Sequence, residues 1–164
     1  MLVLGIDPGC TSTGFGLVRR SRGRYLLVDS GAIRTRASEP MESRLATIFA
    51  GLEAAILRNR PDVCAIEAIF KHKSSESALK LGQARGVALL AAAQSDLQVF
   101  DYNAMTVKKS VTGSGRADKT QMSRVVQMLV GQEVNAPHDA TDAIAIAITH
   151  IAHAAHHAAL EKLA

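Results

Sequence analysis

The chain has 164 residues, which is enough for one well-cored domain and too few for two of ordinary size. Hydrophobic residues make up 48% of it and charged residues 21%, a balance that excludes an intrinsically disordered protein. Its 19 Lys and Arg against 15 Asp and Glu give a net charge of +4, which permits a polyanionic partner without requiring one.

The sequence has no sign of export or membrane insertion. The first residues, MLVLGID, lack a basic segment and reach a carboxylate at Asp7, so they do not predict a signal peptide. No apolar stretch approaches the roughly 18 residues that a membrane span needs. Cys10 and Cys64 have no metal-binding spacing and are typical of small buried residues in a reducing compartment. We therefore expect a cytoplasmic protein.

Three strands are predicted at the start of the chain. Residues 2–6 form a short apolar run rich in β-forming side chains, and the turn-forming residues 7–9 (DPG) end it. Residues 11–18 and 24–33 are two further strand-like segments, and a turn is expected between them at residues 21–23.

Helices and strands then alternate. Residues 40–59 carry apolar side chains at helical spacing, and Pro61 stops that helix. Residues 62–70 (DVCAIEAIF) predict a buried strand, residues 74–95 a helix, and residues 97–102 a last strand.

The final third of the chain is predicted to be helical around one glycine-rich loop at residues 112–117. Asp118 with Gln121 resembles a capping box, which predicts that a helix begins there. From about His138 to the end, the spacing predicts another helix with one apolar stripe formed by Ala140, Ile144, Ala147 and Ile151.

This order of elements indicates an α/β domain. Three early strands followed by helix, strand, helix and strand predict a mixed sheet of five strands that is covered by helices on both faces. We find no internal repeat, low-complexity segment or linker, so residues 1–164 are predicted to form a single domain.

Asp7 and Glu67 are the first two candidate functional residues. Each interrupts an apolar strand near its carboxyl end, which is the edge of an open α/β sheet where ligands bind. A lone carboxylate there is costly unless a cation or hydrogen bonds compensate for its burial.

Asp139 and Asp142 are a second candidate pair. They are three residues apart, so on a helix they share a face, where like charges repel and a divalent cation would relieve the repulsion. Alternatively, Asp139 caps the helix and Asp142 only occupies its favourable first turn.

Four carboxylates form an all-oxygen set, which favours Mg²⁺ or Mn²⁺ over zinc. Two such ions about 3.5–4 Å apart can hold a phosphodiester, activate the attacking water and stabilise the leaving oxygen. No Ser/His/Asp or Cys/His set with a local signature supports a covalent route.

The succession GIDPG, IE at a strand end, LGQARG and DATDAIAIAITH resembles the RuvC family of Holliday-junction resolvases from Gly5 to about His150. The resemblance implies a ribonuclease-H-like fold, a homodimer and two Mg²⁺ ions in each active site, with Mn²⁺ as a substitute. It also implies symmetric nicking of two opposed strands of a four-way DNA junction in recombination and repair. The implied products carry 5′-phosphate and 3′-hydroxyl ends, and the implied partners are RuvA and RuvB.

Within this resemblance the acidic residues take the metal-binding positions: Asp7 the first, Glu67 the second, and Asp139 and Asp142 the final pair. Histidine sometimes occupies the family's third position. His138 precedes Asp139 here and is therefore the alternative third ligand.

Three further residues match DNA-handling positions of the family. Lys108 and Lys119 match its two functional lysines, which would neutralise charge that grows on the scissile phosphate, with Lys109 as the alternative to Lys108. Phe70 matches an aromatic that stacks on bases at the crossover, although a phenylalanine ending a buried strand is an equally good interpretation.

Three other features have two interpretations each. Gly82 and Gly86 lie four apart in a predicted helix, which favours close approach of a second helix, either across a two-fold dimer interface or within the chain. The loop at residues 113–119 is either a DNA-contacting loop or a plain connector. His150, His153 and His157 share a helical face that is either a transition-metal site or a solvated helix end.

Two other function classes stay open from the sequence. The segment GIDPGCTSTGFG also resembles the first phosphate-binding hairpin of actin-like and sugar-kinase-like nucleotide-binding domains. Those proteins need a second, related half to close over the nucleotide. A junction-binding architectural protein without catalysis is the third class.

Overall fold

The computed structural model of the chain describes the backbone of residues 1–68, 75–132, 134 and 137–161, with side chains described in these ranges up to residue 155. Its elements in chain order are β1 (Leu2–Asp7), β2 (Ser12–Ser21), β3 (Arg24–Arg34), α1 (Met41–Asn59), β4 (Val63–Glu67), α2 (Ser75–Gln94), β5 (Gln98–Tyr102), α3 (Ala104–Thr112), α4 (Lys119–Val130) and α5 (His138–Glu161).

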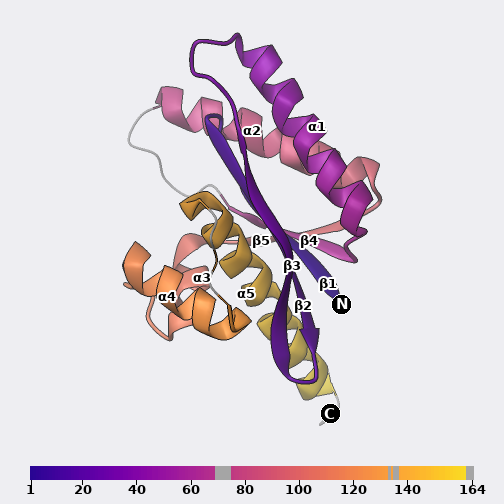
Figure 1. Ribbon diagram of the computed structural model, residues 1–164, viewed down its shortest axis with the longest axis vertical. Helices are drawn as coiled ribbons and strands as arrows, with labels where there is room; N and C mark the ends of the chain where they lie inside the picture. The colour runs from indigo at the N-terminus through magenta and orange to yellow at the C-terminus, as the bar shows by residue number, and fades with distance from the viewer. Residues whose placement is uncertain (69–74, 133, 135–136, 162–164) are drawn as a thin grey trace.

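The five strands form one mixed sheet in the order β3-β2-β1-β4-β5. Strands β1, β4 and β5 are parallel, whereas β2 pairs antiparallel with β1, and β3 pairs antiparallel with β2 at the edge of the sheet. Helices α1 and α2 cover one face, and α3, α4 and α5 lie on the other, with α5 running across β1 and β2 (Figure 1). The predicted α/β class, the mixed five-stranded sheet and its two covered faces are confirmed.

Each face of the sheet has its own hydrophobic core. Leu2, Leu4 and Ile6 of β1 pack among the residues of α1 and α2. Val3, which alternates with them, packs among the residues of α3, α4 and α5. Since successive side chains of a strand point to opposite faces, Asp7 projects to the side of the sheet that α5 covers.

Glycines in β1 and β2 allow α5 to approach the sheet closely. A Cβ atom added to Gly5 would lie 2.0 Å from the carbonyl oxygen of Ala143, and one added to Gly14 would lie 2.0 Å from that of Asp139. Both contacts would be with backbone atoms of α5, which cannot move aside as a flexible side chain can. The first turns of α5 are therefore held against the ends of β1 and β2 because these two positions lack side chains.

We expect Gly5→Ala to destabilise the fold by about 1–3 kcal/mol, the usual cost of forcing extra volume into a packed interior. Chemical denaturation of the variant measures this loss. The control is Glu53→Ala, which changes an exposed side chain of α1 and should leave the stability unchanged. Equal stability of the two variants would contradict the proposed tightness of the α5 contact.

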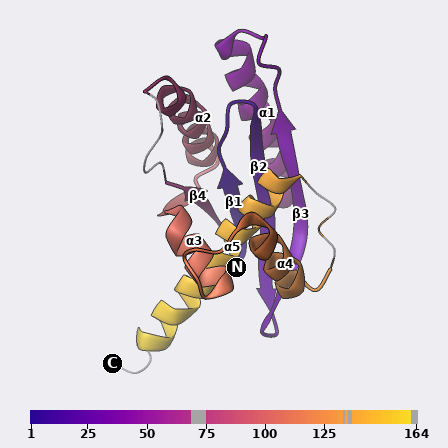
Figure 2. The same ribbon diagram turned by 90° about the vertical axis from the view of Figure 1, so that its left-hand side faces the viewer.

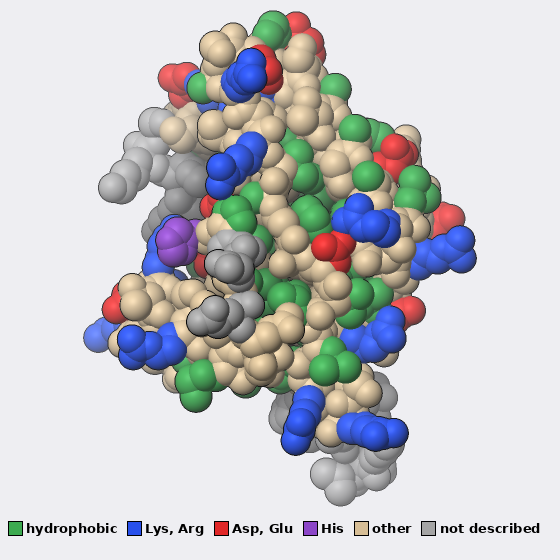
Figure 3. Space-filling model, viewed as in Figure 1, with side chains coloured by type: hydrophobic (Ala, Val, Ile, Leu, Met, Phe, Trp, Pro, Cys, Tyr) green, Lys and Arg blue, Asp and Glu red, His purple; other side chains and the backbone are tan. Residues whose placement is uncertain are grey.

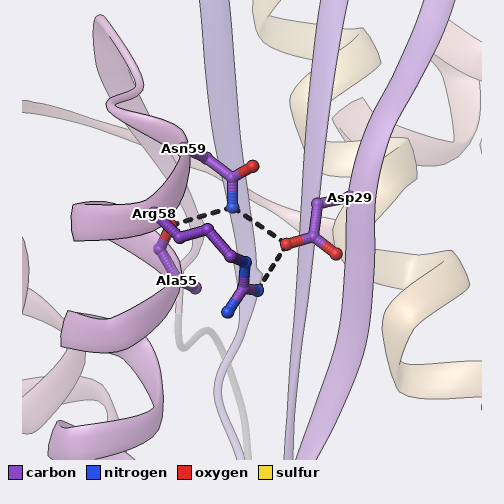
Figure 4. A network of polar contacts seen from close by, with 4 residues as sticks. All are labelled: Asp29, Ala55, Arg58 and Asn59. Carbon is purple, nitrogen blue, oxygen red and sulfur yellow. Dashed lines mark hydrogen bonds and ion pairs between the residues drawn. The ribbon is translucent and has the colours of Figure 1, made fainter.

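A polar network fixes the end of α1 to the edge of the sheet (Figure 4). The guanidinium of Arg58 and the amide of Asn59 both donate to the Asp29 carboxylate on β3, and the Asn59 amide also donates to the carbonyl of Ala55 at 2.9 Å. Partial burial acts to raise the pKa of Asp29, but the two hydrogen bonds outweigh it and the net pKa lies below the usual value. The ionised carboxylate thus stabilises the packing of α1 on β3.

Several element boundaries differ from the sequence predictions. The turn between β2 and β3 contains only Arg22 and Gly23, both with positive φ, and Ser21 belongs to the strand. Strand β4 spans Val63–Glu67, whereas residues 69 and 70 of the predicted strand lie outside the described residues. The capping box of Asp118 and Gln121 is confirmed, as is a helix that begins at His138. Over the ranges that the structure describes, we find no helix with the length and apolar character to cross a membrane.

Candidate active site

Asp7 and Glu67 lie side by side at one edge of the sheet. They are the last residues of β1 and β4, two parallel neighbours whose preceding residues, Ile6 and Ile66, pair directly. Both isoleucines are fully buried in the α1/α2 core, so both carboxylates project to the α5 face. The two acids predicted from separate apolar strands are therefore brought together.

A pocket of about 310 Å³ opens at this edge. The ends of β1 and β4 form its floor, and α3, α4 and α5 form its walls. Asp7, Glu67 and Asp142 supply its acidic lining, Lys108 and Lys119 its basic lining, and Val107, Met122 and Ile146 its apolar lining.

Asp7 is the most perturbed acid of the pocket. Its pKa is raised from 3.8 to about 8, mainly by burial, then by repulsion from Glu67 and a hydrogen bond with it, and less by Asp142 and Asp139. The hydrogen bond between Asp7 and Glu67 acts to raise the pKa of Asp7 and to lower that of Glu67. Two neighbouring carboxylates that cannot both ionise freely have excess negative charge, which a cation would compensate.

The pKa values of Glu67 and Asp142 are also raised, and burial is the main cause for both. Repulsion from Asp142 adds to the rise at Glu67, and repulsion from Asp139 adds to the rise at Asp142. Lys108 and Lys119 act in the opposite direction on both carboxylates. The lysines are therefore close enough to the acids to affect their ionisation.

The structure separates Lys108 from Lys109. Lys108 lies on the side of α3 that lines the acidic pocket, whereas Lys109 lines a different groove together with Thr106, Ser110 and His153. Of the two neighbouring candidates, Lys108 is the one that faces the carboxylates.

Asp139 lies beside the pocket rather than in its lining. It occupies the first turn of α5 and repels both Asp7 and Asp142, and the hydroxyl of Ser12 on β2 donates to its carboxylate at 2.5 Å. His138, the alternative third ligand, is exposed, and its charge lowers the pKa of Asp142. Ser12 was missed by the sequence analysis, because no local pattern links it to a residue 127 positions away.

The acidic residues are chemically suited to a divalent ion of the Mg²⁺ type. They offer only oxygen donors, they are half-buried, and their raised pKa values reflect charge that lacks compensation. Among the residues that the structure describes, no three His, Cys, Asp or Glu side chains are grouped as ligands of one ion. Mg²⁺ is usually bound through one or two carboxylates and keeps several waters, so paired carboxylates meet its requirement.

Other sequence candidates lie elsewhere. Phe70 is outside the described residues, as is the side chain of His157. The ring of His150 is buried, packs at 4.4 Å from the ring of Phe100, and has its Nδ1 2.9 Å from the hydroxyl of Tyr102. His153 also packs against Tyr102. These two histidines are held by aromatic neighbours, and neither lines the acidic pocket.

Comparison with known proteins identifies close relatives. The model of the family described as "Crossover junction endodeoxyribonuclease RuvC" matches residues 3–150. The protein of that name from Geobacter sp. (strain M21) is 46% identical over 162 residues, which cover 99% of this chain and 98% of the relative.

Two solved structures from Thermus thermophilus are also similar. A structure of RuvC superimposes with a TM-score of 0.85 at 34% identity, covering 94% of this chain and 96% of the other. A structure of RuvC in complex with a Holliday junction substrate gives a TM-score of 0.88 at 35% identity and covers 94% of each chain.

Proposed function

Because the chain belongs to the RuvC family of crossover junction endodeoxyribonucleases, we propose that the acidic pocket is where it cleaves the phosphodiester bonds of four-way DNA junctions. We assign cleavage to this pocket because three carboxylates and two lysines line it together, namely Asp7, Glu67, Asp142, Lys108 and Lys119. The protein acts as a Holliday-junction resolvase in DNA recombination and repair.

Membership of the family implies dependence on a divalent metal. We propose two Mg²⁺ ions in each active site, replaceable by Mn²⁺, held by Asp7, Glu67, Asp139 and Asp142. When bound, such ions supply a water of lowered pKa and stabilise the leaving oxygen. The raised pKa of Asp7 supports its role as a metal ligand, since a bound cation would offset the repulsion that Glu67 and Asp142 exert on it.

The chain's own residues position and neutralise the substrate. Lys108 and Lys119 approach the carboxylates from α3 and α4, where their ammonium groups would offset the negative charge that grows on the scissile phosphate. Val107, Met122 and Ile146 give one side of the pocket an apolar wall, which limits water around the reacting group and strengthens these interactions. The proposed products carry 5′-phosphate and 3′-hydroxyl ends.

Cleavage of a synthetic four-way junction by the purified protein tests this proposal. We expect symmetric nicks in two opposed strands that require Mg²⁺ and stop in the presence of a chelator. A protein that binds the junction without metal-dependent nicking would be the architectural protein considered above. The nucleotide-binding alternative is not favoured, because the matching family model and the curated relatives are crossover junction endodeoxyribonucleases.

The third metal ligand is proposed to be Asp139 rather than His138. We expect Asp139→Asn to weaken the rise in melting temperature that Mg²⁺ produces, because it removes a negative charge that adds to the repulsion at Asp142. His138→Ala is the matched control in the same helical turn and should keep the full metal effect. The reverse result in thermal melts would assign the position to His138.

We propose that the protein works as a homodimer whose contact surface is one face of α2. Leu79, Gly82, Gly86 and Leu90 recur on that face at helical spacing, and all four are exposed. A Cβ at Gly82 or Gly86 would meet no atom of this chain within 4 Å, so neither glycine is required for packing inside the chain. Close approach of a second α2 is a physical reason for glycine at both positions.

Gly86→Glu is expected to convert the dimer to a monomer and to abolish paired nicking of opposed strands. The large charged side chain would enter the proposed interface on both copies. Sedimentation velocity measures the assembly state. Leu57→Glu is the control, since it places the same charge at an exposed apolar position on α1 (68% exposed). An unchanged dimer in the Gly86→Glu variant would contradict the α2 interface.

The remaining expectations rest on the family resemblance. We propose that the protein acts in the cytoplasm together with RuvA and RuvB and that Phe70 stacks on a base at the crossover. A stacked base is typically worth about 1–3 kcal/mol, so Phe70→Ala should lower junction cleavage measurably.

A further inference from the structure

The turn between β2 and β3 concentrates positive charge. Four of the 19 Lys and Arg residues of the chain fall within six consecutive positions, and all four are exposed. We call this set the arginine hairpin, and its members are Arg19, Arg20, Arg22 and Arg24. Figure 3 shows Lys and Arg side chains at the lower end of that face of the molecule, over this turn.

The backbone of the arginine hairpin is well defined. The turn has two residues, Arg22 and Gly23, with φ values of 48° and 80°, which is the geometry that continues the natural twist of a two-stranded ladder. The ladder extends to the last pair, Ser21 with Arg24, and Arg20 pairs with Tyr25. The four guanidinium groups therefore extend from a regular hairpin.

No acidic side chain among the described residues pairs with the arginine hairpin. The arginines that do form ion pairs are elsewhere, as in Arg58 with Asp29 and Arg85 with Asp101. Like charges placed close together on a hairpin repel and destabilise it. An uncompensated cluster of this kind is explained most simply by an anion outside the chain.

The arginine hairpin lies at the opposite end of β2 from the acidic pocket. Asp7 pairs with Gly14, and Gly23 is nine residues further along the chain, which corresponds to about 30 Å at about 3.3 Å per residue. Figure 2 shows the turn projecting below α4, on the side of the molecule where α3, α4 and α5 lie. A ligand that reaches both places has to be extended and polyanionic.

We propose that the arginine hairpin binds the phosphate backbone of a junction arm about one helical turn of duplex away from the cleavage site. A turn of B-DNA spans about 34–36 Å, which matches the separation along β2. Guanidinium groups bind phosphate oxygens in a bidentate manner and remain charged at all working pH values. The inference rests on the proposed function and adds to it a second DNA contact. This contact forms only when the junction arm is long enough to reach the arginine hairpin.

The length of the junction arms distinguishes DNA binding by the arginine hairpin from DNA binding by the acidic pocket. Binding is measured by fluorescence anisotropy in EDTA with two junctions, one with long arms and one whose arms have about 6 base pairs closed by loops. Arms of about 6 base pairs reach only about 20 Å at 3.4 Å per base pair, so they end before the hairpin. Both junctions present the same crossover to the pocket.

The test variant is the double substitution Arg20→Gln with Arg24→Gln. On the long-arm junction, its slope of log affinity against log salt should be shallower than that of the wild type by about 1.8, since each lost phosphate contact removes about 0.9. On the short-arm junction the variant should bind as the wild type does. The double variant Arg36→Gln with Arg60→Gln removes the same charge elsewhere and should not show this arm-length dependence.

Two outcomes would overturn the proposal. An unchanged salt slope on long arms would show that the hairpin does not bind DNA and would point to an acidic protein surface as its ligand. An equal loss on both junctions would show a general charge effect rather than an arm contact. Failure of the wild type to cleave either junction with Mg²⁺ would contradict the proposed function instead, whatever the arm-length result.

Discussion

Replacing Asp7 with asparagine is expected to lower the rate of junction cleavage at least about a thousand-fold while the protein still binds the junction. The substitution removes the carboxylate that both Glu67 and Asp142 repel, and with it a proposed metal ligand. Metal ions contribute several kcal/mol of transition-state stabilisation, and each 1.36 kcal/mol corresponds to a factor of ten in rate. Single-turnover cleavage with excess Mg²⁺ measures the effect.

The matched control is Asp96→Asn, which removes one negative charge from an exposed position after α2, away from the pocket. It should cleave as the wild type does. Near-normal cleavage by Asp7→Asn would exclude Asp7 from the active site, and the proposed ligand set would be wrong. Loss of binding in a folded Asp7→Asn protein would assign the residue to DNA binding instead.

The second large effect concerns stability. In metal-free buffer the wild type is expected to lose stability as the pH rises from about 5 to about 8, and Mg²⁺ should restore it. The folded-state pKa of Asp7, about 8, lies above its unfolded value of 3.8. Between these values the folded chain binds the proton more tightly than the unfolded chain, so the free energy of unfolding falls with increasing pH.

A tenfold difference in proton affinity corresponds to about 1.4 kcal/mol, so the shift at Asp7 amounts to several kcal/mol at alkaline pH. Asp7→Asn should therefore make the metal-free protein more stable at pH 8 and flatten its pH profile. Thermal or urea melts of the two proteins at pH 5.5 and 8.0, with and without Mg²⁺, measure the difference. If the stability of the wild type depended on pH as little as that of the variant, the carboxylates would not repel one another in the folded protein.

Asp7→Asn is thus expected to lower the cleavage rate and to raise the stability of the metal-free protein at pH 8. A substitution that abolishes catalysis and stabilises the empty fold is expected where like charges are held together for function. A carboxylate with a purely structural role would lower stability when replaced. Measuring both quantities on the same variant therefore separates an active-site acid from a structural one.

The sequence determined the layers of the fold, and it predicted the acids that the structure places in and beside one pocket. Apolar runs of strand length and apolar side chains at helical spacing predicted five strands in a mixed sheet with helices on both faces. Such patterns are readable because the side chains that an element buries recur along the chain with the period of that element. Asp7 and Glu67 were recognisable because each breaks such a run at the end where α/β sheets bind ligands. The motifs shared with the RuvC family supplied Lys108 and Lys119.

Only the tertiary structure decided which of two candidates adjacent in sequence lines the acidic pocket. Lys108 and Lys109 are adjacent in sequence, and only their orientation on α3 assigns Lys108 to the acidic pocket. The hydrogen bond from Ser12 to Asp139 and the contact of Gly5 with the backbone of α5 join positions more than a hundred residues apart. Local patterns carry no information about such contacts, because they depend on how elements pack and not on the propensity of any segment.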